Sequence, residues 1–407
     1  FAETKRRIAA RQRREQRRRS TITTISAAAA CLVLIVGVSF AMPGMVTGIR
    51  PGDFAGFETA ASMYGGGAAL GVFAAARSSR TAMDWWLAHI SMPVKRGISF
   101  AVDPLPFSAC ELGATVLCLG VLALLVRAVR RRRLADWALH TAVLLVWGYA
   151  GVCALWGTQY YGTGFAEKAG MTAPPVSTET LAAVTDWFAE RVNETAPLTE
   201  RDANGLFAVD KAEIFAGCSG LYDPLTERWP FLSGPERRPK PAVYSKLMSA
   251  WGFTGYLCPL VGESTLNVDC PAVFLPVTIA HELAHQRGVA PEQEANFVGV
   301  MAATASGRAA YRYSGWLFGY LHLSNALYTA DPARAAESYR LLCAEAQTDL
   351  ADNNAYWKQW EGPVRETGEK VYTTFLQGYG QTLGMRSYGA CVDLLVEEFL
   401  PNTTAGD

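Results

Sequence analysis

The stretch TIAHELAHQRGVAPEQEANF, residues 278–297, places two of the chain's five histidines four positions apart, with a glutamate beside the first. A chain of this composition contains a His-Glu-x-x-His pattern by accident in about one case in a hundred or fewer. On a helix, His281 and His285 lie one turn apart on the same side, so both imidazoles can reach one ion. Glu282 lies next to the first histidine, at the angle needed to hold a metal-bound water. A lone histidine is usually structural, but this trio predicts a zinc site.

The residues around the motif favour a helix that presents it. Pro276 can start this helix, and Gly288 can end it. A catalytic zinc ion needs a third protein ligand and an open fourth position. The following PEQEANF supplies Glu292 and Glu294 at the start of a second helix, where one acid would also be ordinary complementation of the helix dipole. These residues alone leave the choice of third ligand open.

The rest of the chain indicates a membrane anchor. Of its 407 residues, 50% are hydrophobic and only 18% are charged, which is a low charge content for a soluble protein. Three apolar stretches can cross a bilayer as helices, at about residues 21–43, 105–128 and 137–157. A cleaved signal peptide is the alternative for the first, but no small-residue cleavage pattern clearly follows it. The Ala/Gly-rich ASMYGGGAALGVFAAA at 61–76 is weakly hydrophobic, and we predict a small packed or interfacial segment there.

Two basic clusters orient the membrane region, residues 21–157. The net charge of the chain is zero, yet the tail at 1–20 and the connection at 127–133 are rich in arginine. Basic loops stay in the cytoplasm, so we expect both clusters inside the cell, and the loop at 44–104 and all of 158–407 outside it. A basic run beside a membrane helix is typically an orientation signal and a contact for anionic lipid. We therefore expect membrane lipid as a partner and no nucleic acid.

The remaining part, residues 158–407, is predicted to be one mostly helical domain. Ser/Thr starts and apolar residues at helical spacing recur in it, as in VSTETLAAVTDWFAERVNET. Residues 257–274 have the β-branched residues and turn formers of short strands or an extended loop. In an exported domain, Cys258 and Cys270 are the best-placed pair for a disulfide. The expected fold class is mostly α: a three-helix transmembrane region followed by an α+β extracytoplasmic domain.

Several blocks of this sequence resemble a known family. They are HELAHQRG at 281–288, EQEANF at 292–297, the preceding KLMSAWGFTGYLCPLVGESTLNVDCP and the following YRYSGW. With them, most of the chain is similar to the bacterial family designated domain of unknown function 3810. The resemblance implies three N-terminal membrane helices and a zincin domain of the gluzincin type outside the membrane. It implies no substrate, because the family is uncharacterised.

The gluzincin resemblance also implies roles for single residues. Glu282 would be the general base on zinc-bound water and would later deliver a proton to the leaving amine. Tyr311 and Tyr313 are the candidates for holding the developing oxyanion. Residues 264–268 would pair with a substrate strand, as edge strands do in other zincins. His322 is expected to be structural.

For the third ligand, gluzincins commonly carry the pattern Glu-x-x-Ala-Asp on the second helix. Glu292 fits the position of the ligand, and Asn296 stands where the wider group has an acid that supports the site from the second shell. Glu294 would point roughly 200° round the helix from Glu292, so the two cannot both face the ion. The loop at 286–290 is short for a gluzincin, and a tighter turn there would bring Glu294 round instead. We therefore favour Glu292 and retain Glu294 as the alternative.

Two classes of function follow. The first is a membrane-anchored zinc-dependent metallopeptidase that hydrolyses peptide bonds of a peptide or protein outside the cytoplasm. The second is a non-proteolytic membrane protein that keeps the zincin fold for sensing or for binding a cell-surface partner. An intact motif favours the first class, because a binding module has no need of Glu282.

Overall fold

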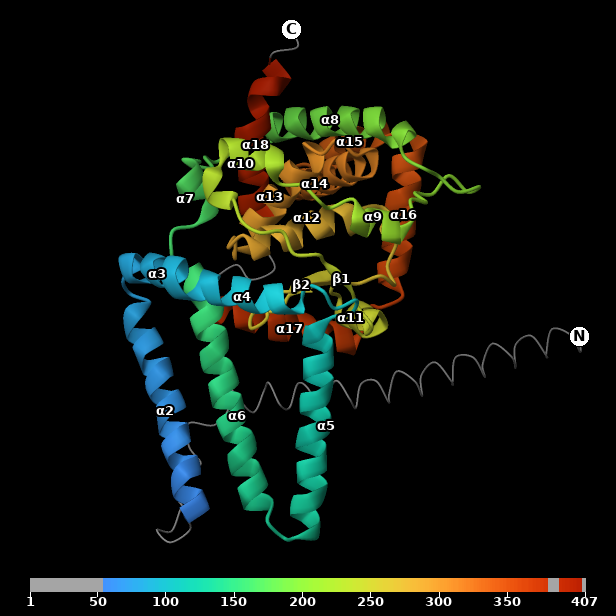
Figure 1. Ribbon diagram of the computed structural model, residues 1–407. Helices are drawn as coiled ribbons and strands as arrows, with labels where there is room; N and C mark the ends of the chain where they lie inside the picture. Colours follow the sequence, from blue (N-terminus) through green and yellow to red (C-terminus); the bar gives the residue numbers. More distant parts are fainter. Residues whose placement is uncertain (1–53, 380–387, 405–407) are drawn as a thin grey trace, which may run out of the picture. The chain divides into compact units, whose positions relative to one another are not determined.

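The computed structural model describes residues 54–379 and 388–404 (Figure 1). Within these residues the chain is mostly helical, as predicted, with one small three-stranded sheet. The predicted first membrane span at 21–43 and the basic tail at 1–20 lie outside the described residues. The chain divides into two compact units, Phe1–Val72 with Cys118–Gly151, and Phe73–Leu117 with Val152–Asp407.

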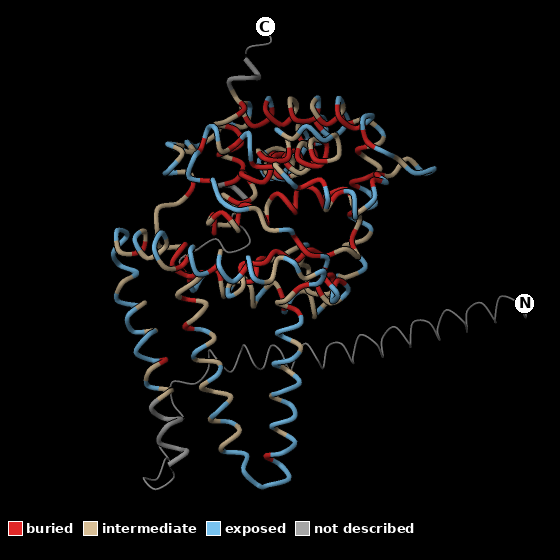
Figure 2. The backbone as a smooth tube through the Cα atoms, in the orientation of Figure 1, coloured by how far each residue is buried: buried red, intermediate tan, exposed pale blue. Residues whose placement is uncertain are grey.

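Two of the described helices are long and apolar enough to cross a membrane. They are α5 (Ala109–Arg130) and α6 (Leu134–Leu155), each of 22 residues. They correspond to the predicted spans at 105–128 and 137–157. Most residues along both helices are exposed or half-buried (Figure 2), so their apolar side chains have few protein neighbours. An exposed apolar surface of this length suits contact with lipid.

The Ala/Gly-rich segment at 61–76 forms the last two thirds of an uninterrupted helix, α2 (Phe54–Ala76). In the first unit this helix packs against α6. The indole Nε1 of Trp147 donates a hydrogen bond to the carbonyl oxygen of Ser62 at 3.0 Å. A Cβ atom on Gly66 would lie 2.7 Å from a methyl carbon of Val146. Glycine therefore allows the two helices to approach closely at this point.

The second unit holds most of the shorter helices. Two precede α5, namely α3 (Arg80–Trp86) and α4 (Met92–Val102). The others follow α6 in chain order: α7 (Phe165–Ala169), α8 (Thr178–Thr195), α9 (Lys211–Ala216), α10 (Asp223–Arg228), α11 (Ser245–Trp251), α12 (Leu275–Gln286), α13 (Glu292–Thr304), α14 (Ala309–Ala330), α15 (Pro332–Leu341), α16 (Ala344–Lys358), α17 (Pro363–Gly378) and α18 (Tyr388–Thr404).

The core of this unit lies between α8, α12, α13, α14 and α18. Phe188 of α8, Phe297 of α13 and Leu317 of α14 are wholly buried in one continuous cluster. Figure 1 shows α12 and α13 between the small sheet on one side and α8 with α14 on the other. The motif helix is thus a central element of the core, with neighbours on several sides.

Helix α12 begins and ends where the sequence predicts. Pro276 occupies its first turn, where the missing amide hydrogen costs nothing. Gly288 has a positive φ of 92° just beyond the last turn, a conformation that favours glycine. Ten of its twelve residues are buried. The histidine motif is therefore held on a rigid helix.

The small sheet has the strand order β1-β3-β2. Its strands are β1 (Lys240–Pro241), β2 (Gly255–Leu257) and β3 (Ser264–Leu266). Strand β3 pairs in parallel with β1 and antiparallel with β2, so both of its edges are occupied. The prediction that residues 264–268 offer a free edge to a substrate is therefore wrong, because β1 covers the edge that β2 leaves.

The predicted disulfide between Cys258 and Cys270 is also wrong, since both residues are free thiols. Cys258 directly follows β2, and its amide donates a hydrogen bond to the carbonyl oxygen of Glu263 across the hairpin. Cys270 lies beyond the far end of β3, where its thiol donates to the carbonyl oxygen of Asn267. The hairpin thus places the two cysteines at opposite ends, out of disulfide reach.

Candidate metal centre

Two imidazoles and one carboxylate meet where α12 faces the start of α13. His281 Nε2 lies 3.3 Å from one carboxylate oxygen of Glu292, and His285 Nε2 lies 3.6 Å from the other. The two imidazole rings are nearly perpendicular, with centroids 4.6 Å apart. One ligand atom from each of the three residues lies within 4.8 Å of the other two. This group could hold a metal ion.

The separations can be compared with those around a small tetrahedral ion. Ligand atoms at about 2.0–2.1 Å from zinc lie about 3.3–3.4 Å from one another in a tetrahedron. The two nitrogen–oxygen separations, 3.3 and 3.6 Å, are of this size, although they end on different oxygens of Glu292. Two histidines and one glutamate are also a known donor set of catalytic zinc sites. The side chains of His281 and Glu292 remain 13% and 23% exposed, so solvent reaches part of the group.

The two helices approach closely because of two glycines. Gly288 reverses the chain after α12, so that α13 returns alongside it after a short loop. Gly299 faces the backbone of His281, and a Cβ atom there would lie only 3.0 Å from its amide nitrogen. Glu292 lies seven residues before Gly299, about two helical turns, and therefore on nearly the same face of α13. The close helix contact and the carboxylate ligand thus share one side of α13.

His285 is oriented from behind. Its Nδ1 donates to the carbonyl oxygen of Val289 at 2.6 Å, which leaves Nε2 to face Glu292. The edge of the imidazole also packs against Trp156, with ring centroids 5.3 Å apart. Burial alone would lower the pKa of His285, but the charge of Glu292 and the hydrogen bonds raise this pKa to about 9. In the metal-free protein this imidazole therefore binds a proton in the place of the ion.

The pairing with the two imidazoles also shifts the pKa of the Glu292 carboxyl group. Burial would raise the pKa of Glu292, but the charges of His285 and His281 lower it well below its usual value. Glu292 is thus ionised, as a metal ligand must be.

His281 is less firmly supported. Its Nδ1 is buried and has no hydrogen-bond partner among the described residues. Asn296, predicted to support the site from the second shell, is half-buried one turn along α13 from Glu292 and does not bond this nitrogen.

His322 is a buried histidine near His281. Burial and the neighbouring His281 lower the pKa of His322 to about 4, which keeps His322 neutral near neutral pH.

Glu282 lies beside the group without belonging to it. Its side chain is buried, and its Oε2 atom has no hydrogen-bond partner among the described residues. Burial raises the pKa of this carboxyl group. Gly255 of β2 makes room for it, since a Cβ atom there would lie 2.7 Å from Oε1. A buried, unsatisfied carboxylate of raised basicity is suited to take a proton from water.

Glu294 faces elsewhere. Its two carboxylate oxygens accept hydrogen bonds from the amides of Phe165 and Ala166, at 2.8 and 3.2 Å. These amides open α7, so Glu294 caps that helix. The carboxylate that faces the two imidazoles is that of Glu292.

The structure does not bring Tyr311 and Tyr313 to the group. The hydroxyl of Tyr311 donates to the carbonyl oxygen of Ile214 at 2.8 Å, and that of Tyr313 donates to Asp349. Both side chains are buried in the core. Their spacing on α14 reflects packing, so the prediction that one of them serves the site is corrected.

Another tyrosine reaches the group from α17. The hydroxyl of Tyr372 donates a hydrogen bond to Glu292. Burial and the charge of Glu292 raise its pKa well above the usual value, so it keeps its proton. Tyr160, whose pKa burial and Glu292 also raise, lies nearby, and its hydroxyl accepts a hydrogen bond from the indole of Trp156. No spacing relative to the motif marks Tyr372, which follows Glu292 by 80 residues.

The family model described as "Protein of unknown function (DUF3810)" matches residues 89–396. The chain belongs to the DUF3810 family. The match confirms the resemblance seen in the sequence, and it includes the histidine motif, Glu292 and Tyr372. No curated protein and no solved structure matches this DUF3810 protein.

Proposed function

We propose that this DUF3810 protein is a membrane-anchored, zinc-dependent metallopeptidase of the gluzincin type that hydrolyses peptide bonds outside the cytoplasm. One observation carries the proposal: the buried carboxyl group of Glu282, whose Oε2 has no hydrogen-bond partner among the described residues, stands beside a His281, His285 and Glu292 group that could hold a metal ion. A site that only stored or sensed a metal would have no use for this carboxyl group, because a buried polar atom without a hydrogen bond destabilises the fold.

The proposed reaction is hydrolysis of an amide bond. A bound zinc ion would supply Lewis-acid polarisation and a lowered pKa for water. Glu282 takes one proton from the attacking water, the new carbon–oxygen bond forms, and the carbon–nitrogen bond breaks. Glu282 then returns the proton to the leaving amine nitrogen, so the carboxylate ends in its starting state. The raised pKa of Glu282 suits both transfers, because a base nearer neutrality both accepts and releases a proton more readily.

Tyr372 is the proposed donor to the developing oxyanion. It stays protonated and already lies against the ligand group. With His281, His285 and Glu292 holding an ion, the hydroxyl of Tyr372 would be available to donate to a substrate oxygen. This role replaces the one expected for Tyr311 or Tyr313.

The location outside the cytoplasm is part of the proposal. Helices α5 and α6 would cross the bilayer together with the predicted span at 21–43, and the arginine-rich turn at 127–133 would remain inside. The substrate would be a peptide or protein on the outer side, and membrane lipid would surround the anchor.

The test compares the full-length protein with its Glu282→Gln variant. Metal content and hydrolysis of a broad mixture of peptides are measured for both. We expect Glu282→Gln to keep zinc and to lose at least about a hundredfold in hydrolysis, because general base catalysis contributes about 10²–10⁴. Glu345→Gln, which removes a carboxylate from the first turn of α16, is the matched control and should change neither property.

Two results would contradict the proposal. If hydrolysis persists in Glu282→Gln, the assigned base is wrong. If the wild-type protein binds zinc but cleaves no peptide in the mixture, the non-proteolytic sensing or binding function is favoured instead.

A further inference from the structure

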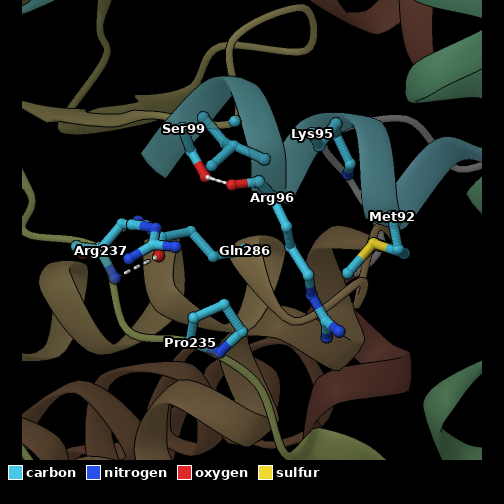
Figure 3. Close-up of a pocket in the computed structure, with 9 residues that line it drawn as sticks. Met92, Lys95, Arg96, Ser99, Pro235, Arg237 and Gln286 are labelled. Atoms are coloured by element: carbon cyan, nitrogen blue, oxygen red, sulfur yellow. Dashed lines mark hydrogen bonds between the residues drawn. The ribbon is translucent and has the colours of Figure 1, made fainter. Parts of the chain in front are cut away.

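A polar pocket lies between α4 and the loop before β1. Figure 3 shows Lys95, Arg96 and Ser99 on α4, with Arg237 and Gln286 across from them. The space between its lining residues, counted together with the solvent at its open mouth, is about 290 Å³. Within the pocket itself there is room for about one water molecule, so a larger ligand extends into the mouth.

A lysine is unusual at a position as buried as that of Lys95. Its side chain is buried, with a relative exposure of 3%, and its ammonium has no hydrogen-bond acceptor among the described residues. The ammonium lies over the face of Trp156, 5.0 Å from the ring centroid. The indole attracts the charge but accepts no N–H hydrogen bond of ordinary strength. Burial, with the neighbouring charge of Arg96, lowers the pKa of Lys95 to about 7.

Two further cations line the pocket. Within the part of the chain that the structure describes, the guanidinium of Arg96 donates one long hydrogen bond, to the carbonyl oxygen of Ser233 at 3.3 Å. The buried Nε atom of Arg237 has no partner among the described residues. The residues that line the pocket include no aspartate or glutamate. The acid next to Arg237 in the chain, Glu236, is paired with Arg287.

We propose that this pocket binds an oxyanion of the phosphate type. Keeping a buried ammonium charged without a hydrogen-bonding partner costs several kcal/mol, and a bound anion would offset this cost. One phosphate oxygen would occupy the deep position next to Lys95. The remaining oxygens would face Arg96 and Arg237 at the mouth, where guanidinium groups match two oxygens at once.

This chemistry has two possible sources, a free phosphate or the headgroup of an anionic phospholipid. Helix α4 ends seven residues before α5, one of the two candidate membrane helices, so a lipid headgroup is one natural source. The pocket adjoins the metal group, because Trp156 lies between Lys95 and His285, but none of its lining residues is one of the three proposed ligands. The proposal does not depend on peptide hydrolysis.

The experiment uses the full-length protein purified in phosphate-free detergent. Binding of inorganic phosphate is measured by calorimetry and thermal unfolding at constant ionic strength, with chloride as the reference anion. Binding of a short-chain phosphatidylglycerol is measured by native mass spectrometry, with phosphatidylcholine as the reference lipid. The variants are Lys95→Met and Arg237→Gln, and Lys246→Met serves as the control because it removes the same charge from an exposed position.

We expect saturable binding of at least one of the two probes by the wild-type protein. Both pocket variants should bind at least about tenfold more weakly, the loss expected for one charge-assisted hydrogen bond, while Lys246→Met binds normally. Lys95→Met should fold, because it replaces a buried charge with an apolar side chain of similar length. Phosphate binding identifies a free anion as the source, and binding of phosphatidylglycerol alone identifies the headgroup. Absence of saturable binding for both probes, or equal losses in Lys95→Met and Lys246→Met, would overturn the proposal.

Discussion

The spacing between α12 and α13 can be tested by adding one carbon atom, in Gly299→Ala. The new Cβ would lie 3.0 Å from the amide nitrogen of His281 and 3.1 Å from its Cα atom. Ordinary contacts between such atoms are about 3.5–4.0 Å, so α13 must move away by about half an ångström. These neighbours are backbone atoms and cannot swing aside. Metal sites tolerate only about 0.2 Å in ligand distances, so this movement should draw Glu292 off the ion.

The expected effects have definite sizes. Overpacking costs about 1–3 kcal/mol, of which the better helix propensity of alanine returns up to about 1 kcal/mol. Zinc affinity should fall about tenfold to a hundredfold, as it does when the support of a ligand is disturbed. Gly97→Ala is the matched control, because Gly97 lies inside α4 and a Cβ atom added to it would meet nothing within 4 Å. It should be neutral or slightly stabilising.

The measurements are zinc affinity by competition with a chelator and thermal unfolding of the metal-free full-length protein. A Gly299→Ala protein that is destabilised but binds zinc as tightly as Gly97→Ala would show that the helix spacing does not set the ligand geometry. Unchanged stability would refute the close approach of the two helices itself.

Three further predictions concern the metal group, and a fourth concerns the membrane topology. Glu292→Gln should weaken zinc binding far more than Glu294→Gln; the reverse order, measured by chelator competition, would transfer the ligand role to Glu294. The pKa of metal-free His285 is raised to about 9, so below that pH zinc must displace a proton from this imidazole. The apparent affinity for zinc should therefore rise about tenfold per pH unit from about pH 7 to 9 and then level off. Calorimetry in buffers of different ionisation enthalpy should detect this release at pH 7, and no dependence on the buffer would disprove it. Tyr372→Phe should lower kcat about 10²–10³-fold with less than about a tenfold change in zinc affinity; a loss of zinc with normal kcat at saturating zinc would mean that the hydroxyl only positions Glu292. Reporter fusions after residue 157 should be exported and those within 127–133 cytoplasmic, and a cytoplasmic signal from the C-terminal part would reverse the topology.

The motif helix was predictable because its signals are local. Pro276, Gly288 and the four-residue spacing of the histidines act within one helix, so one window of sequence contains them all. Helix periodicity also indicates that Glu292 and Glu294 must diverge. Which of the two faces the imidazoles depends on how α13 returns, and this is decided by packing at Gly299 and by the amides of α7 that Glu294 caps.

The surroundings of the site were not predictable in the same way. Tyr372 and Trp156 reach the group from segments far from the motif, and neither carries a pattern that marks it. Tyr311 and Tyr313 lie close to the motif in the sequence, but on helix α14 both side chains are buried in the core. Pairing of β3 with β1 likewise joins residues 25 positions apart, Lys240 with Thr265, and such non-local pairing leaves no periodic trace.

The three ligands lie close together in the sequence, whereas Tyr372 lies far beyond them, and the ribosome therefore makes them at different times. His281, His285 and Glu292 lie within twelve residues, whereas Tyr372 is made 80 residues after Glu292. At about 5–20 residues per second, the ribosome needs about 4–16 seconds to make that interval. During this interval the three ligands have been made, but α17, which carries Tyr372, is not yet complete. An ion can therefore meet the three ligands seconds before α17 and Tyr372 join them.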